Sequence, residues 1–254
     1  MRAALQLSGR TAVITGVASG IGRALALHAA DRGMTVVGCD RDIAGIDLLT
    51  GELAARGCTA ELHIADVSDP AAMAALAQAA LPLPPIALLF ANAGLLRKGS
   101  VLETSFADWR TLVNVNLLGA VATLQAFVPA MLAAGQPAQV VVTGSTGSMI
   151  AAPGLAAYCG TKHALWPVVE ALREELAGSS VGASLLMPGA VATHIFDGID
   201  PNRAAPADSM SPEQVANIAF AGALADLPKI LTHPAYVARA EERFGRVVGE
   251  LSAR

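Results

Sequence analysis

Charged residues are scarce in this sequence, and the positive ones form no cluster. Asp, Glu, Lys and Arg make up 15% of the 254 residues, whereas soluble domains typically contain about 25%. The 17 Lys and Arg residues against 21 Asp and Glu residues give a formal net charge of −4. Proteins that bind nucleic acid concentrate positive charge to meet the phosphates, so we expect no nucleic-acid partner.

Cysteine is also rare. Cys39, Cys58 and Cys159 are odd in number, and their spacing matches no common metal site. We therefore expect neither a disulfide framework nor a metal centre, and we interpret these thiols as buried or incidental.

The sequence lacks an apolar run typical of a membrane span. Residues 111–161 contain no charged residue and no histidine, but their most apolar part, residues 117–134, is interrupted by Thr123, Gln125 and Pro129. No flanking clusters of Lys and Arg fix an orientation. We interpret this part as a core or subunit-contact helix followed by a buried strand, and we expect no membrane partner. The N-terminal residues contain no apolar stretch of signal-peptide length, so the expected location is the cytoplasm.

Hydrophobic residues, in contrast, make up 54% of the chain, which predicts a large buried core. Short β-branched runs alternate with Ala- and Leu-rich segments of helical spacing, the pattern of βαβ units. Most predicted strands are apolar throughout, as in a parallel sheet that helices cover on both faces. No composition shift or repeat divides the chain, so residues 1–254 are predicted to form one α/β domain. The predicted strands are residues 12–15, 35–39, 60–64, 86–90, 140–143, 183–186 and 230–231, and the predicted helices are residues 21–32, 43–56, 70–80, 106–134, 155–177 and 212–225.

One long segment, residues 190–211, has no clean periodicity and contains Gly198, Pro201 and Pro206. Loops of this length inside a compact domain are usually lids, binding loops or disordered segments. We interpret it as a substrate lid, with a surface excursion as the alternative.

Three glycines follow the first predicted strand, where a dinucleotide pyrophosphate would bind. Gly16, Gly20 and Gly22 precede or open a helix with the spacing Gly-x3-Gly-x-Gly, which differs from the general Gly-x-Gly-x-x-Gly pattern. Glycine lets the backbone approach the phosphates, and the free N–H groups at the helix start favour the anion. Together with an acid at the end of the second strand, this turn predicts a dinucleotide site.

That acid is Asp40, 18 residues after Gly22. A carboxylate there can accept both adenosine-ribose hydroxyls and would repel a 2′-phosphate, so NAD is favoured over NADP. Arg41 weakens this preference for NAD, because a guanidinium beside the ribose could accommodate the phosphate of NADP. An ordinary turn acid is the alternative interpretation of Asp40. Asp66, after the third strand, is predicted either to face the adenine or to cap the next helix.

Tyr158 and Lys162 are four residues apart at the start of a predicted helix and therefore share one of its faces. A free phenol has a pKa of about 10. An ammonium about 4 Å away stabilises the phenolate by about 4 kcal/mol at an effective dielectric constant of about 20, which would bring the pKa of Tyr158 close to neutrality. We interpret the pair as a general acid/base, with Ser145 after the fifth strand as its neighbour. A solvated helix face is the alternative.

These residues belong to a series of motifs with a familiar order. The chain contains TGVASGIG (15–22), ANAG (91–94), NVN (114–116), Ser145, YCGTK (158–162) and PGAVAT (188–193). In this combination it resembles the short-chain dehydrogenase/reductase family over about residues 7–195. The resemblance implies a one-domain, Rossmann-like, doubly wound fold with about seven parallel strands. It also implies an enzyme that interconverts a secondary alcohol and a ketone by hydride transfer.

The resemblance assigns catalytic roles to four residues. Tyr158 would exchange the proton, and Lys162 would hold the nicotinamide ribose and lower the pKa of the tyrosine. Ser145 would hydrogen-bond the reacting oxygen, with Ser148 as a less well spaced competitor. Asn116 would hold a water that passes protons toward Lys162.

The same resemblance places the dinucleotide along the glycine turn, the following strand ends and the PGAVAT segment. Val191 and Thr193 would meet the nicotinamide carboxamide and so fix which face of the ring is presented. The predicted cofactor-binding residues are Gly16, Ser19, Gly20, Ile21, Gly22, Asp40, Arg41, Asp66, Val67, Asn92, Ala93, Gly94, Tyr158, Lys162, Pro188, Gly189, Val191 and Thr193.

Apolar residues dominate the stretches expected to line the substrate pocket, which suits a modest-sized hydrophobic alcohol or ketone. His194 is polar, and a surface or lid histidine is the alternative to a catalytic contact. The predicted substrate-binding residues are Leu96, Ser145, Met149, Tyr158, His194 and Phe196.

In this family the helices equivalent to 106–134 and 155–177 pair between subunits, which implies a homotetramer, or else a homodimer. The tail, residues 228–254, is expected to add a strand and a helix, and contains no motif that indicates chemistry. The predicted function is an NAD(H)-dependent alcohol dehydrogenase or carbonyl reductase. The alternatives are an NADPH-dependent carbonyl reductase, a non-catalytic nucleotide-binding regulatory protein, and a hydro-lyase or epimerase on the same scaffold.

Overall fold

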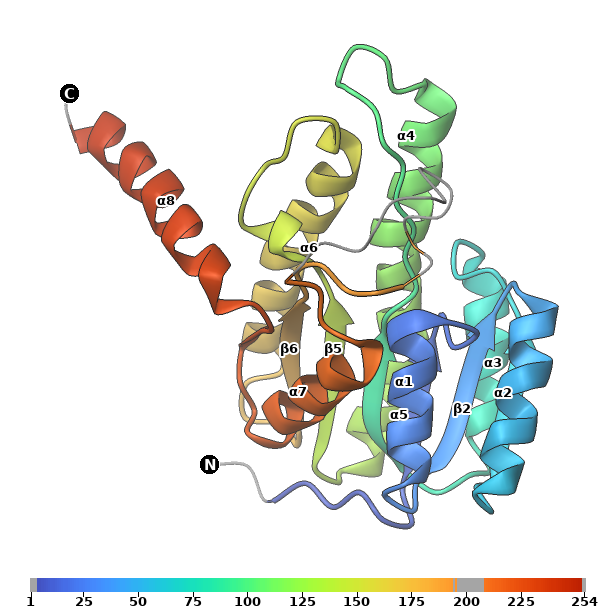
Figure 1. Ribbon diagram of the computed structural model, residues 1–254. Coiled ribbons are helices and arrows are strands. Elements are labelled where there is room, and N and C mark those ends of the chain that lie inside the picture. Colours follow the sequence, from blue (N-terminus) through green and yellow to red (C-terminus); the bar gives the residue numbers. More distant parts are fainter. Residues whose placement is uncertain (1–3, 194, 196–207, 253–254) are drawn as a thin grey trace.

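Seven parallel strands form one sheet in the order β3-β2-β1-β4-β5-β6-β7 (Figure 1). The computed structural model describes residues 4–193, 195 and 208–252. All seven strands predicted from the sequence are confirmed, six of them with one to three additional residues. The strands are β1 (Thr11–Thr15), β2 (Thr35–Asp40), β3 (Ala60–Ile64), β4 (Ile86–Ala91), β5 (Ala138–Thr143), β6 (Val181–Met187) and β7 (Lys229–Leu231).

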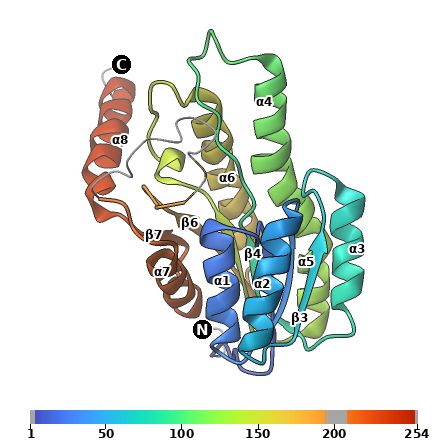
Figure 2. The ribbon, with the colours of Figure 1, turned by 45° about the vertical axis from the view of Figure 1, so that its right-hand side comes forward.

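Helices cover both faces of this sheet, as the continuously apolar strands predict. Successive residues of a strand point to opposite faces, so Val13 of β1 packs in one core and Ile14 in the other. Figure 2 shows this layering from a second direction. One face carries α1 (Gly20–Ala30), α2 (Ile43–Ala55) and α7 (Pro212–Leu224), and the other carries α3 (Pro70–Ala80), α5 (Gly119–Ala134) and α6 (Ala156–Glu175).

The strand order reverses next to β1, and this reversal places the site. From β1 the chain proceeds to β2 and β3 on one side, whereas β4 begins the other half of the sheet. In open α/β sheets, ligands bind in the crevice at the carboxyl ends of the strands where the order reverses. The loops at the carboxyl ends of β1, β4 and the strands beside them are therefore where a functional site is expected.

The helix predicted at residues 106–134 is one helical stretch with an irregular centre. A π-helical segment, Val113–Leu118, joins α4 (Phe106–Leu112) to α5. By length and composition alone the stretch is apolar enough to cross a membrane. Its large buried side chains, Phe127 and Met131, instead join the core on the α5 face of the sheet, as expected of a core helix.

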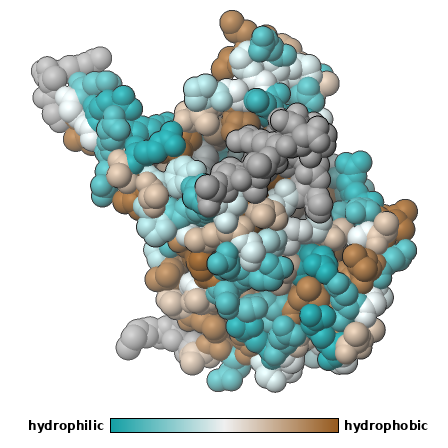
Figure 3. Space-filling view, viewed as in Figure 1, coloured by the Kyte–Doolittle hydropathy of each residue, from teal (hydrophilic) through white to brown (hydrophobic). Residues whose placement is uncertain are grey.

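The outer end of this helical lobe is apolar. Leu102, in the β4–α4 connection, is 95% exposed and Phe106 is 81% exposed. Figure 3 shows hydrophobic atoms at this tip of the molecule. The pairing of this helix between subunits, expected from the sequence, stays a prediction.

The tail contains the strand and the helix that the sequence predicts there. After β7 comes a short 3-10 turn, Pro234–Tyr236, and then α8 (Val237–Ser252). In Figures 1 and 2, α8 stands apart from the layered body. Arg243 holds the helix to that body, because its guanidinium donates to the carbonyl oxygen of Met149 (2.6 Å) and also contacts Nε2 of His163.

Candidate active site

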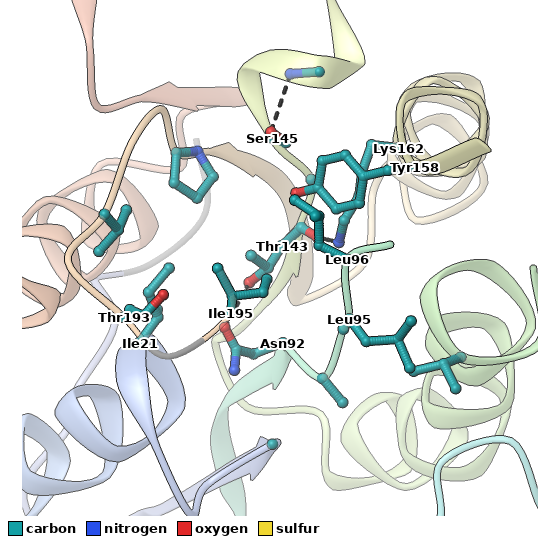
Figure 4. A pocket seen from close by; sticks show the side chains of 18 of the residues that line it. Ile21, Asn92, Leu95, Leu96, Thr143, Ser145, Tyr158, Lys162, Thr193 and Ile195 are labelled. Atoms are coloured by element: carbon teal, nitrogen blue, oxygen red, sulfur yellow. Dashed lines mark hydrogen bonds between the residues drawn. The ribbon is translucent and has the colours of Figure 1, made fainter. Parts of the chain in front are cut away.

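A cavity of about 660 Å³ runs along the carboxyl ends of the strands (Figure 4). It is lined by residues that follow β1 through β6, by the start of α6 and by residues of the tail. Most of the residues that the sequence predicts for the site line this cavity. The exceptions among the described residues are Gly20, Asn116 and Met149, and the predicted residues His194 and Phe196 lie outside the described residues.

The glycine turn after β1 is packed so closely that side chains would not fit. A Cβ added at Gly22 would lie 1.8 Å from the carbonyl oxygen of Gly16. Gly16 and Gly20 have φ values of +74° and +52°, and a Cβ at Gly20 would lie 2.9 Å from Cγ2 of Thr193. The turn therefore presents bare backbone to the cavity at the start of α1, where N–H groups and the helix dipole favour an anion.

Asp40 ends β2 and does two things at once. Its Oδ2 accepts from the backbone N–H of Ala18 (3.0 Å), and its Oδ1 accepts from the N–H groups of Arg41 (2.7 Å) and Asp42 (3.1 Å). These bonds fit the turn-acid interpretation, and they also tie the end of β2 to the glycine turn. Asp40 lines the cavity as well. Its role in the turn is therefore compatible with a second role in binding the adenosine ribose.

Asp66 and Arg41 face each other at the same end of the cavity. Nη1 of Arg41 lies 3.3 Å from Oδ2 of Asp66. The other oxygen of Asp66 accepts from the backbone N–H and hydroxyl of Ser68. Asp66 does not cap the next helix, because Asp69 accepts from the N–H of Ala71 and occupies the N-cap of α3. The prediction that Asp66 caps this helix is therefore wrong, because Asp69 directly precedes α3 and its side chain makes the cap bond.

Asn92 joins the ends of three neighbouring strands. Its Nδ2 donates to the carbonyl oxygen of Thr15 at the end of β1 (3.1 Å). Its Oδ1 accepts from the hydroxyl of Thr143 at the end of β5 (3.2 Å), close to the centre of Figure 4. The residues after β4 are thereby fixed, and they line the cavity together with Val67, which follows β3.

Asn116 is buried within the π-helical segment, and its amide holds the backbone of Leu95. Oδ1 accepts from the N–H of Leu95 (2.8 Å), while Nδ2 donates to the Leu95 carbonyl (2.9 Å) and to the Thr161 hydroxyl (3.1 Å). A Cβ at Gly94 would lie 3.3 Å from both Oδ1 of Asn116 and Nζ of Lys162. The asparagine is thus near the lysine, and a proton-passing water between them stays a prediction.

Ser145 begins a 3-10 turn, Thr146–Ser148, directly after β5. Its Oγ accepts from the N–H of Gly147 (3.0 Å), the bond drawn in Figure 4, and its side chain lies close enough to Tyr158 to act on the pKa of the tyrosine, which it lowers. Ser148 instead donates to the carbonyl oxygen of Lys162 (2.7 Å) and does not line the cavity. The structure therefore favours Ser145 over Ser148 as the hydroxyl that meets a substrate.

Tyr158 and Lys162 point into the cavity from one face of α6, as their spacing predicts. Nζ of Lys162 lies 5.9 Å from the centre of the Tyr158 ring and donates to the carbonyl oxygen of Thr143 (2.7 Å). Burial lowers the pKa of Lys162 to about 8. Burial also raises the pKa of Tyr158, and the nearby side chain of Ser145 offsets only part of that effect. The sequence predicts a pKa of Tyr158 close to neutrality, and the structure does not bear this out. Desolvation of the phenolate outweighs the contributions that lower the pKa.

The segment after β6 lines the cavity next to the glycine turn, where Thr193 lies beside Gly20. Pro188, Gly189, Val191 and Thr193 all line it. The N–H of Gly189 donates to Nδ1 of His233 (3.1 Å), and a Cβ at Gly189 would lie 2.6 Å from the imidazole ring. No sequence signal marks His233, which follows β7 and is distant in the chain, as a support for this segment.

The end of the cavity beside Tyr158 is mainly apolar and differs in part from the prediction. Leu96 lines it, as predicted, but Met149 does not; its neighbour Ile150 does. The side chain of Met149 is buried in the core on the α5 face, and of these two core residues only Ile150 also reaches the cavity. The tail contributes Tyr236 and Arg239, although it carries no recognisable motif.

Comparison with known proteins agrees with this geometry. The family model described as short chain dehydrogenase matches residues 10–204. The chain is 37% identical over 220 residues to the 1-deoxy-11-beta-hydroxypentalenate dehydrogenase of Streptomyces exfoliatus, a match that covers 85% of this chain and 80% of the relative.

Solved structures are similar over nearly the whole chain. A short chain dehydrogenase/reductase from Burkholderia phymatum in complex with NAD has a TM-score of 0.90 and 33% sequence identity, and the match covers 96% of each chain. A gluconate 5-dehydrogenase structure from Beutenbergia cavernae with bound NADP at low occupancy has a TM-score of 0.82 and 32% identity, over 93% of this chain and 100% of that one.

Fold and cavity together are those of a Rossmann-like oxidoreductase. With the family model matching most of the chain, the protein belongs to the short-chain dehydrogenase/reductase family, whose members use NAD or NADP. The residues present fit such a dinucleotide, because the glycine turn leaves bare backbone where a pyrophosphate would pass and Asp40 lies one strand away.

Proposed function

We propose that the protein interconverts a secondary alcohol and a ketone with NAD(H), on a modest-sized substrate with a largely apolar body. The observation that carries this proposal is that Tyr158, Ser145 and Lys162 lie together in the same cavity as the glycine turn. Oxidation of an alcohol requires a proton carrier next to a hydride acceptor, and this arrangement supports both requirements.

The side chains have separate tasks in this reaction. A bound nicotinamide would supply the site that takes up or returns the hydride. In the oxidation direction, Tyr158 accepts the proton of the substrate hydroxyl while Ser145 hydrogen-bonds the same oxygen. In the reduction direction, Tyr158 returns the proton to the ketone oxygen as negative charge develops there. Lys162 favours the phenolate form when protonated.

A spectrophotometric screen tests the reaction. Secondary alcohols of graded size are supplied with NAD+, and the NADH absorbance band is followed. Formation of the ketone with matching NADH supports the proposal. Product without a net change in cofactor absorbance would indicate a hydro-lyase or epimerase, and dinucleotide binding without any turnover would indicate a regulatory protein.

The charges at the adenosine end support NAD over NADP. Asp40 and Asp66 both line that end, and the guanidinium of Arg41 is paired with Asp66 at 3.3 Å. A 2′-phosphate would have to approach two carboxylates and compete with one of them for the arginine. The similar structures include both NAD and NADP complexes, so the proposal depends on these charges.

The variant Asp40→Ala is expected to lower kcat/KM for NAD+ by about 10- to 100-fold, because hydrogen bonds to a charged group contribute about 1.5–3 kcal/mol. The value for NADP+ should stay level or rise, because the repulsion is gone. Asp42→Ala is the control. It removes the same charge only two residues further along the chain, but the side chain of Asp42 does not line the cavity. A strong preference of the native enzyme for NADPH would contradict the proposal.

The pH dependence of oxidation should report on the coupled pair Tyr158 and Lys162. Because the pKa of Lys162 is lowered to about 8, the pair loses its first proton near that pH, and the singly deprotonated pair is the form that can accept a proton on Tyr158. The logarithm of kcat/KM for alcohol oxidation is therefore expected to rise with pH up to about 8 and then to level off.

Lys162→Arg separates the two groups, because arginine keeps its proton throughout this range. Only Tyr158 then titrates, and burial raises its pKa above the ordinary value. The rise should accordingly continue beyond pH 9 in this variant. An unchanged break near pH 8 in Lys162→Arg, or a break near the ordinary histidine value, would contradict the assignment.

A further inference from the structure

Among the described residues, both carboxylates that line the cavity lie at its adenosine end. Asp40 and Asp66, with the paired Arg41, line the adenosine end. At the end beyond Tyr158, the charged lining residues are Arg97 and Arg239. Within the described part of the chain, no Asp or Glu lines that end. A protein with a net charge of −4 thus presents positive charge where a substrate has to lie.

Arg239 is placed to bind an anion. It lies in the first turn of α8, and its guanidinium carbon is 5.8 Å from the centre of the Tyr236 ring, which also lines the cavity. The aromatic face supports the guanidinium. Among the residues that the structure describes, no carboxylate pairs with Arg239. Arg243, one turn further along, fixes α8 to the body and so fixes the position of Arg239.

The neighbouring arginine is already engaged. Nε of Arg97 lies 3.7 Å from Oδ1 of Asp108 in α4, and its Nη1 donates to the carbonyl oxygen of Leu96 (3.2 Å). Its charge is therefore partly neutralised, whereas the charge of Arg239 is not. Among the described residues that line this end, Arg239 is therefore the cation without a carboxylate partner.

The walls between Tyr158 and Arg239 are apolar. Leu96 and Ile150 are buried side chains that line the cavity, and the ring of Tyr236 adds a further apolar surface. Apolar walls stabilise a hydrocarbon body by excluding water from it. The cavity therefore combines a proton carrier, an apolar middle and a cationic end.

We infer that the substrate is a hydroxy acid or keto acid whose carboxylate is bound by Arg239 while Tyr158 and Ser145 meet its hydroxyl or carbonyl group. The two parallel N–H groups of a guanidinium match a carboxylate. This inference names a substrate class for the proposed function and rests on it for the reacting group. The carboxylate itself takes no part in bond making, and its charge does not change during the reaction.

Binding to the NADH-loaded enzyme tests the charge preference without turnover. Cyclohexanecarboxylate and its neutral twin, cyclohexanecarboxamide, are titrated by calorimetry. The carboxylate is expected to bind at least about tenfold more tightly, which corresponds to about 1.4 kcal/mol. Arg239→Gln should remove that advantage and leave the affinity for the carboxamide nearly unchanged.

Arg246→Gln is the matched control, because Arg246 lies two turns further along α8 and does not line the cavity. It removes the same charge and should leave both affinities at their native values. Equal binding of the two probes, no measurable binding of the carboxylate, or an equal loss in Arg246→Gln would each overturn the inference.

Turnover then separates this inference from the proposed reaction. 4-Hydroxycyclohexanecarboxylate and its methyl ester are compared as alcohol substrates with NAD+. A lower KM for the acid, lost in Arg239→Gln, supports both proposals. Turnover of the ester at least as well as the acid overturns the inference and leaves the reaction standing. Preference for the carboxylate in binding, with no oxidation of any secondary alcohol, overturns the reaction and leaves the anion site standing.

Discussion

Tyr158→Phe is expected to lower kcat for alcohol oxidation by about 10²- to 10⁴-fold, the usual contribution of a positioned general acid/base. The substitution removes one oxygen atom and leaves the aromatic ring against Lys162 and Ser145. Without that oxygen, the substrate loses the proton carrier that the proposed reaction assigns to Tyr158. The glycine turn and Asp40 are untouched, so the affinity for NADH should stay within about twofold of the native value, a change of about 0.4 kcal/mol.

The measurement follows the NADH absorbance band for turnover and the tryptophan fluorescence for NADH binding. Tyr236→Phe is the matched variant, because Tyr236 is the other tyrosine of the chain and also lines the cavity, but it belongs to the turn after β7 and not to α6. Its effect on kcat should stay below about tenfold. A loss of similar size in both variants would show that the cavity needs its shape rather than the hydroxyl of Tyr158.

The sheet and the motifs that act over short spacing were predictable from the sequence. A strand covered on both faces has to be apolar at every position, so its sequence indicates its environment directly. Tyr158 and Lys162 share a face of α6 because helical geometry places residues four apart side by side. Gly57 directly follows the C-cap of α2 with a φ value of +66°, a conformation that glycine adopts without steric cost.

Contacts between distant segments were not predictable in the same way. The side-chain amide of Asn116 is hydrogen-bonded to both backbone groups of Leu95, a contact that no local spacing indicates. The π-helical segment that presents it interrupts a sequence with ordinary helical periodicity. Tyr236 and Arg239 reach the cavity only because β7 and the turn after it bring the tail next to the end of β6. Such placements depend on the assembled fold and not on local spacing.

The prediction that the pKa of Tyr158 is close to neutrality was wrong for a physical reason. Spacing alone shows that an amine can lie near Tyr158, but it does not show how much water both groups lose. In the structure, burial lowers the pKa of Lys162 to about 8 and raises that of Tyr158. The charge that would have stabilised the phenolate is itself destabilised, so the two groups have to be treated as one titrating pair.

The steric demands of the glycine turn lead to a second large effect. Gly22→Ala is expected to lower the free energy of unfolding by more than about 3 kcal/mol, beyond the usual cost of overpacking. The new Cβ would lie 1.8 Å from the carbonyl oxygen of Gly16 and 2.6 Å from its carbonyl carbon. Both atoms are backbone, so the turn after β1 has to move as a whole. That movement also displaces the backbone that faces the dinucleotide, and NADH binding should weaken strongly.

Gly51→Ala gives the matched comparison, because both glycines lie within helices. Alanine is favoured over glycine in a helix interior by about 0.5–1 kcal/mol. At Gly51 in α2 no atom lies within 4 Å of the added Cβ, so this variant should gain stability by about that amount. The same substitution is therefore expected to have opposite signs in α1 and α2. Urea unfolding followed by circular dichroism measures both, and a Gly22→Ala protein with native stability and native NADH affinity would show that the turn does not have the tight packing described above.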